Sequence, residues 1–162
     1  MDIFSLADKV AVVTGACGLL GREHCKALAE AGAIVVVADL DEAAAERIST
    51  GLGTGHLAIG MDVTDRGSLM AARRRILDAY GRLDVLVNNA AINDMFESPL
   101  LASEQSMFEN YPLDLWDRSW KVNVSGVFLC SQILGGVMAE RGKGSIINIA
   151  STYGIVAPDQ TI

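Results

Sequence analysis

The apolar residues of this chain follow two kinds of pattern, short continuous runs and longer segments with helical spacing. Short apolar runs rich in β-branched residues predict buried strands, and they span residues 10–13, 33–38, 56–61, 83–87 and 145–150. Apolar positions at helical spacing predict helices over residues 20–31, 42–52, 64–80 and 113–138. The strand runs are continuous rather than alternating, which favours strands covered on both faces. The pattern therefore predicts an α/β fold, a parallel sheet with helices on both faces.

Right-handed crossovers between such strands give the order 3-2-1-4-5, in which the ends of strands one and four meet at a topological switch point. Polar or glycine residues follow the carboxyl end of every predicted strand, and these are Gly15, Asp39, Asp62, Asn89 and Ser151. Because ligands bind at the switch point in open sheets of this kind, the convergence predicts a nucleotide site there.

The turn after the first strand carries glycine at positions 15, 18 and 21. Glycine lets a phosphate approach the backbone N–H groups at a helix N-terminus, where a Cβ would hold it away. The spacing is Gly-x-x-Gly-x-x-Gly rather than Gly-x-Gly-x-x-Gly, so a tight connection without a ligand remains an alternative.

Asp39 ends the second strand about 20 residues after the glycine turn, where a dinucleotide fold places its ribose-binding carboxylate. The alternative is that Asp39 or Asp41 caps the next helix, and we favour ribose binding for Asp39 and capping for Asp41. Thr64 or Asp65 is expected to cap the third helix. Residues 92–112 show little periodicity and predict a long functional or mobile loop.

The composition argues against several classes of protein. The 162 residues suit one domain, and 51% of them are hydrophobic, which allows a sizeable core. A net charge of −7 argues against nucleic acid or an anionic membrane as partner, and no apolar run reaches the ~20 residues of a membrane helix. Three cysteines without a Cys-x-x-Cys pair indicate reduced thiols in the cytoplasm and no metal site.

Five motifs in order resemble the short-chain dehydrogenase/reductase family, in its compact branch. They are Thr14-Gly15 with Gly21, Asp62-Val63, Asn88-Asn89-Ala90-Ala91, Asn123 in Lys-Val-Asn-Val, and Ser151 after Ile-Ile-Asn-Ile-Ala. The resemblance implies a Rossmann-type doubly wound sheet that binds NAD(P) over residues 1–162. It also implies hydride transfer between a nicotinamide and an alcohol or carbonyl substrate, for instance a sugar or surface-glycan precursor, in a homodimer or homotetramer.

Carried over position by position, the resemblance assigns cofactor binding to Gly15, Cys17, Gly18, Leu19, Leu20, Gly21, Asp39, Leu40, Asp62, Val63, Asn89, Ala90 and Ala91. Ser151 is the expected catalytic serine, which would donate to the substrate oxygen. Asn123 would hold a water in the proton path or, alternatively, would only fix its helix. NAD is favoured over NADP because Asp39 would repel a 2′-phosphate and no Arg or Lys occupies positions 17, 18 or 40.

The chain departs from the family pattern at three places. Leu19 stands where the compact branch has glycine, and Ala91 also replaces a glycine. The family's Tyr-x-x-x-Lys motif does not follow Ser151, because Tyr153 is too close and no lysine comes after Lys143. We therefore expect an N-terminal fragment of a longer protein, itself inactive. The rival functions are a dinucleotide-binding module without catalysis, or a nucleotide-sugar epimerase or dehydratase of the extended branch.

Overall fold

The computed structural model describes residues 3–93, 108–151 and 154 of the chain. Its elements are β1 (Val10–Thr14), α1 (Leu19–Glu30), β2 (Ile34–Asp39), α2 (Glu42–Leu52), β3 (Leu57–Gly60), α3 (Arg66–Tyr80), β4 (Val85–Asn88), the 3₁₀ turn η2 (Phe108–Asn110), α5 (Leu113–Trp120), the π-helical segment η3 (Lys121–Gly126), α6 (Val127–Glu140) and β5 (Ser145–Asn148). Of the loop predicted over 92–112, residues 94–107 lie outside the described residues.

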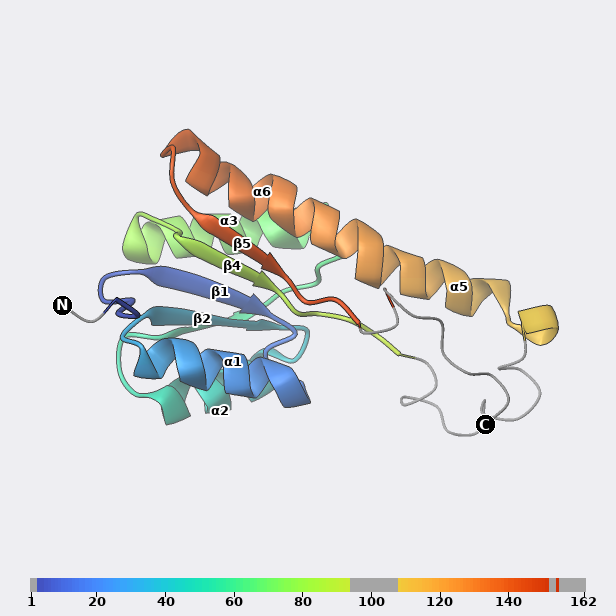
Figure 1. The fold of residues 1–162 in the computed structure, drawn as a ribbon, viewed down its shortest axis with the longest axis horizontal. Coiled ribbons are helices and arrows are strands. Elements are labelled where there is room, and N and C mark those ends of the chain that lie inside the picture. Colours follow the sequence, from blue (N-terminus) through green and yellow to red (C-terminus); the bar gives the residue numbers. More distant parts are fainter. Residues whose placement is uncertain (1–2, 94–107, 152–153, 155–162) are drawn as a thin grey trace.

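The five strands form one parallel sheet in the order β3-β2-β1-β4-β5, which confirms the predicted topology. Figure 1 shows α1 and α2 on one face of this sheet, with α3 and α6 on the other. The strand residues divide accordingly: Val10, Val12 and Val36 pack in the cluster with α3 and α6. Val35 and Val37 pack in the cluster with α1 and α2.

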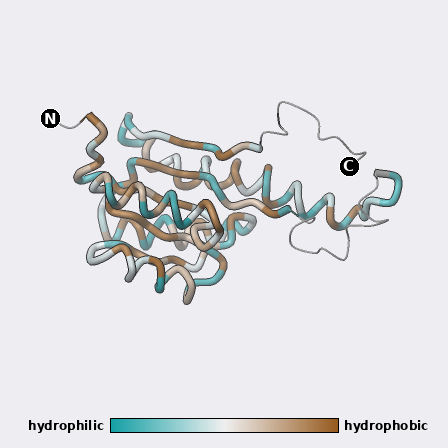
Figure 2. The backbone as a smooth tube through the Cα atoms, turned by 60° about the horizontal axis from the view of Figure 1, so that its bottom comes forward, coloured by the Kyte–Doolittle hydropathy of each residue, from teal (hydrophilic) through white to brown (hydrophobic). Residues whose placement is uncertain are grey.

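Burial explains why the strand runs are apolar throughout. Every residue of β1 is buried, and in Figure 2 the hydrophobic strands run through the interior between the helices. Each fully buried Val, Leu or Ile stabilises the fold by roughly 1.5–3 kcal/mol relative to an exposed one. The covered strands β1, β2 and β4 therefore anchor the end of the sheet where the candidate site lies.

Caps and turns set the helix boundaries. Asp41 caps α2, because its carboxylate accepts a hydrogen bond from the Ala44 N–H at 2.9 Å, as predicted. Asp65, rather than Thr64, caps α3 by accepting from the Gly67 and Ser68 N–H groups. At its other end, α3 stops at Gly81, whose φ of +66° is left-handed.

The long helix predicted over 113–138 is present but is not uniform. Its middle turns, η3, are π-helical, and the helical path runs on to Glu140. The α6 half packs on the sheet through Cys130, Ile133, Leu134, Val137 and Met138. The path Leu113–Glu140 is long and apolar enough to cross a membrane by length and composition alone. The burial of α6 within the fold matches a core helix as well.

An ionic cluster holds the opposite end of the sheet from the candidate site. The buried Asp84 accepts from the Val10 N–H at 3.0 Å and from Arg82 at 2.6 and 2.7 Å, and Arg141 lies 3.4 Å away. Burial alone would raise the pKa of Asp84, but these hydrogen bonds and charges outweigh it and lower the pKa from 3.8 to about 2. The carboxylate thus ties β4 to β1 where both strands begin.

Candidate functional site

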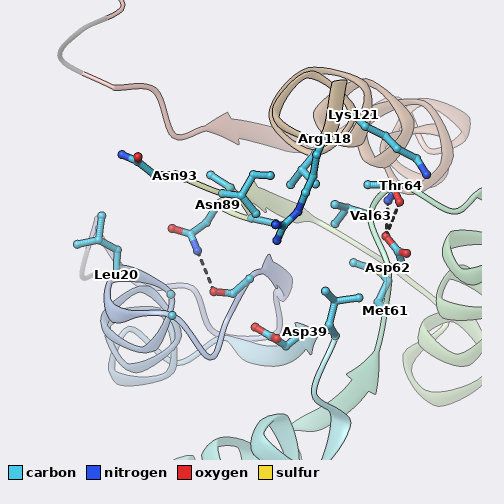
Figure 3. Close-up of a pocket in the computed structure, with 18 of the residues that line it drawn as sticks. Leu20, Asp39, Met61, Asp62, Val63, Thr64, Asn89, Asn93, Arg118 and Lys121 are labelled. Carbon is cyan, nitrogen blue, oxygen red and sulfur yellow. Dashed lines mark hydrogen bonds between the residues drawn. The ribbon is translucent and has the colours of Figure 1, made fainter. Parts of the chain in front are cut away.

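A cavity of about 790 Å³ lies at the carboxyl ends of β1, β2, β3 and β4, and Figure 3 looks into it. Its lining includes every predicted cofactor residue except Cys17: Gly15, Gly18, Leu19, Leu20, Gly21, Asp39, Leu40, Asp62, Val63, Asn89, Ala90 and Ala91. The remaining lining residues are Met61, Thr64, Ile92, Asn93, Arg118, Lys121 and Val122. Folding therefore gathers residues from four strand ends, from the start of α1 and from the long helix around a single space.

The glycine turn is closed by two glycines, at 15 and 21. Gly15 has a φ of +60°, and a Cβ there would lie 2.7 Å from the Ala90 Cα. A Cβ at Gly21 would meet the Gly15 carbonyl oxygen and lie 2.7 Å from the Ala16 Cα. At Gly18 a Cβ would meet only the Gly15 oxygen, at 3.3 Å. Positions 15 and 21 therefore need glycine, while position 18 has more room.

The same turn explains how leucine is accommodated at position 19. Leu19 is the first residue of α1, and its φ is not in the left-handed region, so no glycine is required there. Gly18, the N-cap, provides no side-chain cap, and backbone N–H groups of the first turn face the cavity end of the helix. The helix N-terminus carries partial positive charge, so this end of the cavity suits a phosphate.

Asp39 joins the glycine turn to the end of β2. Its Oδ2 accepts from the Cys17 N–H at 2.8 Å and its Oδ1 from the Asp41 N–H at 3.3 Å. The carboxylate therefore does not cap α2, and it faces the cavity beside the turn (Figure 3). Each carboxylate oxygen can accept further hydrogen bonds, which leaves capacity for ligand hydroxyls.

Thr14 and Asn89 lock the ends of β1 and β4 together at the switch point. The Thr14 hydroxyl accepts from the N–H groups of Asn89 and Ala90, both at 3.0 Å. In return, the Asn89 side-chain amide donates to the carbonyls of Thr14 and Gly15, also at 3.0 Å. This mutual bonding fixes the glycine turn against the strand-four loop before any ligand arrives.

Asp62 and Val63 form the opposite wall, after β3. The Asp62 carboxylate accepts from both the backbone N–H and the hydroxyl of Thr64, at 2.8 Å each. Val63 is buried, and a Cβ on Gly126 would lie 2.9 Å from its Cγ2. The helix η3–α6 therefore passes directly over Val63, and the wall there is apolar.

Asn123 sits in the π-helical segment and is paired with the loop after β4. Its Oδ1 accepts from the Ile92 N–H at 2.9 Å and its Nδ2 donates to the Ile92 carbonyl at 3.0 Å. Both polar groups of the amide are thus engaged, as the placement of an asparagine on an apolar helix requires. This contact supports the positioning role that the sequence left open, and the water-holding role remains a prediction.

Ser151 lies three residues after β5 and is exposed. Neither Ser151 nor Asn123 lines the cavity, and Tyr153 lies outside the described residues. Beside this strand end, Asn88 is buried and donates to the Ser131 hydroxyl at 3.1 Å and to the Asn148 Oδ1 at 2.8 Å. Asn123 thus borders the cavity through Ile92, whereas Ser151 lies after β5 and is not part of the lining.

Two basic residues of the helix, Arg118 and Lys121, enter the lining without having been predicted. In Figure 3, Arg118 points from α5 toward the middle of the cavity, whereas Lys121 points toward Thr64. No motif marks Arg118, and Lys121 stands in the Lys-Val-Asn-Val motif without a role assigned to it. The only sequence signal was their position within five residues of Asn123.

The cysteines near the turn behave as packing thiols. Cys25 is buried, and burial raises the pKa of its thiol to about 12. Cys17 is half-buried, and desolvation together with the Asp39 carboxylate raises the pKa of its thiol to about 11. Both thiols are therefore protonated at neutral pH, which makes them poor nucleophiles.

The profile of a family described as short chain dehydrogenase matches residues 9–161. D-threitol dehydrogenase of Mycolicibacterium smegmatis is 35% identical over 162 residues, which cover 98% of this chain and 58% of the relative. NAD-dependent glycerol dehydrogenase of Listeria innocua is 31% identical over 159 residues, which cover 98% of this chain and 59% of that relative.

Among solved structures, a short-chain type dehydrogenase/reductase from Mycobacterium marinum superposes with a TM-score of 0.86 and 31% identity. The superposition covers 98% of this chain and 60% of that one. The chain therefore spans 58% and 59% of the length of these two curated relatives.

Proposed function

Because the chain belongs to the short-chain dehydrogenase family, we propose that residues 1–162 form one NAD-binding domain of a cytoplasmic oxidoreductase. The proposed reaction is hydride transfer between the nicotinamide and an alcohol or carbonyl substrate. One observation carries the proposal: the glycine turn, the Asp39 carboxylate and the apolar wall at Val63 line the same cavity. NAD supplies the hydride carrier, and the protein supplies position and electrostatics.

The cavity offers suitable residues for three parts of the dinucleotide: the pyrophosphate, the ribose and the adenine. The pyrophosphate would approach the backbone of the turn, since a Cβ at Gly15 or Gly21 would fill that space. The ribose hydroxyls would donate to Asp39, and the adenine would lie against Val63. Asn89 and Thr14 hold these parts in place through the hydrogen bonds between β1 and β4.

NAD is proposed over NADP because a carboxylate accepts two ribose hydroxyls but repels a phosphate. Replacing Asp39 by Ala should weaken NADH binding about tenfold or more, the worth of hydrogen bonds to a charged group, with a much smaller loss for NADPH. Calorimetric titration with both cofactors measures the ratio of their affinities.

Asp41→Ala is the matched control, since this neighbouring carboxylate caps α2 and does not line the cavity. It should cost about 1 kcal/mol of stability and leave the affinity ratio unchanged. Equal losses of NADH and NADPH binding in the Asp39 variant would count against the ribose assignment.

For the reaction, Ser151 would donate its hydroxyl proton in a hydrogen bond to the substrate oxygen, which stabilises the charge that develops there. Asn123 would hold the Ile92 backbone at the rim of the cavity and, in the second proposed role, a water for proton transfer.

The proposed substrate class is a short polyol, because D-threitol and glycerol appear in the names of two relatives. Such a substrate is uncharged and rich in hydroxyl groups, like the sugar precursor expected from the sequence. NAD reduction by the whole protein, measured for threitol, glycerol and a monohydric alcohol of equal carbon number, tests the class. A preference for the monohydric alcohol would contradict it.

We further propose a homodimer or homotetramer that buries the outer face of the long helix. Five exposed apolar side chains follow one another there every three or four residues: Leu113, Trp116, Trp120, Val124 and Phe128. Trp116 and Trp120 stack with centroids 5.9 Å apart, and both are 54% exposed. A contiguous apolar stripe of this kind is typical of an interface.

A further inference from the structure

We propose that Arg22 is a positioning residue of the cofactor site, which holds the Asp39 carboxylate in place through the backbone of Cys17; this inference rests on the proposed function. Arg22 lies near the start of α1 and does not line the cavity. Its Nε donates to the Cys17 carbonyl oxygen at 2.9 Å, five residues back along the chain. The Cys17 N–H in turn donates to the Asp39 Oδ2 at 2.8 Å. Cys17 is thus hydrogen-bonded on both sides, to α1 and to the end of β2.

Within the described residues, the start of α1 lacks the side-chain cap that α2 and α3 have. Asp41 and Asp65 accept hydrogen bonds from the first turns of those two helices, whereas the N-cap of α1 is Gly18. Glycine leaves the backbone freer than any other residue, so the peptide between Cys17 and Gly18 gains most from an outside restraint. The guanidinium of Arg22 provides that restraint, and a charged donor makes a stronger hydrogen bond than a neutral one.

The orientation of the Asp39 carboxylate depends on this turn. Its other hydrogen bond within the fold, from the Asp41 N–H to Oδ1, is longer, at 3.3 Å. Hydrogen bonds weaken steeply when their geometry is poor, so a carboxylate that accepts two ribose hydroxyls must be held in one orientation. By fixing Cys17, Arg22 orders Asp39 before the ribose arrives, which lowers the entropy lost on binding.

The alternative is that Arg22 acts only through its positive charge, which would attract the pyrophosphate to the start of α1. Three substitutions separate the two roles. Arg22→Gln places an amide nitrogen as many bonds from the backbone as Nε is, but removes the charge. Arg22→Lys keeps the charge and moves the donor one atom further out. Arg22→Met removes both the donor and the charge.

Calorimetric titration of the complete chain with NADH and NADPH measures the effect of each change. Arg22→Met should weaken NADH binding about two- to tenfold, the worth of one hydrogen bond. NADPH should lose less, because a loosened Asp39 also repels a 2′-phosphate less. Arg22→Lys should lose as much as Arg22→Met, whereas Arg22→Gln should bind both cofactors as the wild type does. In an Asp39→Ala background, Arg22→Met should cause no further loss of NADH binding, because the residue through which Arg22 acts is gone.

Lys26→Met is the matched control, since it removes an equal charge from α1 one turn further along, on an exposed side chain that does not line the cavity. Its affinities should equal those of the wild type, and all single variants should melt within a few degrees of it. A loss that Lys restores and Gln does not would make the charge of Arg22 its role and overturn the inference. Unchanged NADH binding by Arg22→Met, or the same loss in the Asp39→Ala background, would also overturn it. A wild-type chain that binds neither NADH nor NADPH would instead overturn the proposed function.

Discussion

The strands β1 and β5 belong to the same sheet and both carry adjacent β-branched residues, yet their surroundings are opposite. β1 lies between β2 and β4, and all five of its residues are buried. β5 is an edge strand within the described part of the chain, and all four of its residues are exposed. Ile146 and Ile147, which point to opposite faces, are each 44% exposed. An apolar run thus predicts a strand without predicting that both faces are covered.

The long helix, Leu113–Glu140, also has a part that is covered by the rest of the fold and a part that is exposed. Its α6 half is buried on the sheet, while no residue of α5 is buried. The candidate site lies where the covered region ends. Most of its lining follows the carboxyl ends of β1, β2, β3 and β4 or begins α1, and only Arg118, Lys121 and Val122 come from the long helix. The covered region therefore supports the candidate site, and the exposed region leaves apolar side chains in contact with solvent.

The largest effect is expected in the covered region, from Gly21→Ala. The added Cβ would meet the backbone of Gly15 and Ala16, which cannot move without opening the turn. We expect a loss of stability of about 1–3 kcal/mol and of NADH binding by tenfold or more. Urea unfolding and calorimetric titration measure the two effects.

Gly18→Ala is the matched control for that change. Its Cβ would approach a single atom, the Gly15 carbonyl oxygen at 3.3 Å, so stability should change by less than about 1 kcal/mol. If both variants lost the same stability, steric closure of the turn at Gly21 would not be the cause.

The next effect concerns the ionic cluster at the far end of β1 and β4. Asp84→Asn keeps the shape of the side chain but removes the charge that Arg82 and Arg141 face. Because the pKa of Asp84 is lowered to about 2, its contribution is present above the ordinary value of 3.8 and is lost as the pH falls toward 2. The variant should lose about 2 kcal/mol at neutral pH and approach the wild type in acid.

Urea midpoints across this pH range measure the difference between the two proteins. Asp78→Asn serves as the control, because this carboxylate is exposed on α3. A stability gap for the Asp84 variant that stayed constant down to pH about 2 would exclude the charge as its origin.

The smallest effect on stability is expected from a substitution on the exposed face of the long helix. Phe128 is 61% exposed, so Phe128→Glu should change stability by only about 0.5 kcal/mol. The same change should shift the protein toward monomer, because a charge in an apolar interface is costly. Light scattering over a concentration series measures the molecular mass.

Ala139→Glu adds the same charge to an exposed position of α6 outside the apolar stripe, and it should leave the mass unchanged. A wild-type protein that is monomeric at every concentration would refute the oligomer proposal. Identical masses for the wild type and the Phe128 variant would refute the role of this face.

Local pattern and the general rules of parallel sheets predicted the strand order and the cap at Asp41. The family resemblance assigned thirteen residues to the cofactor, and twelve of them line the cavity. The sequence could not choose between Thr64 and Asp65 as the cap of α3, since both suit that position. It also missed Arg118 and Lys121, because a helix pattern does not specify which turn overhangs a cavity formed by distant strands.

The sequence by itself determined the alternation of strands and helices and the residue types at the strand ends, since these follow from hydrophobic spacing and turn chemistry. Only the tertiary structure decided which apolar residues are covered, that Gly21 rather than Gly18 closes the turn, and that the Asn123 amide engages Ile92. These outcomes depend on contacts between residues far apart in the chain. Such contacts arise from packing, which no local pattern records.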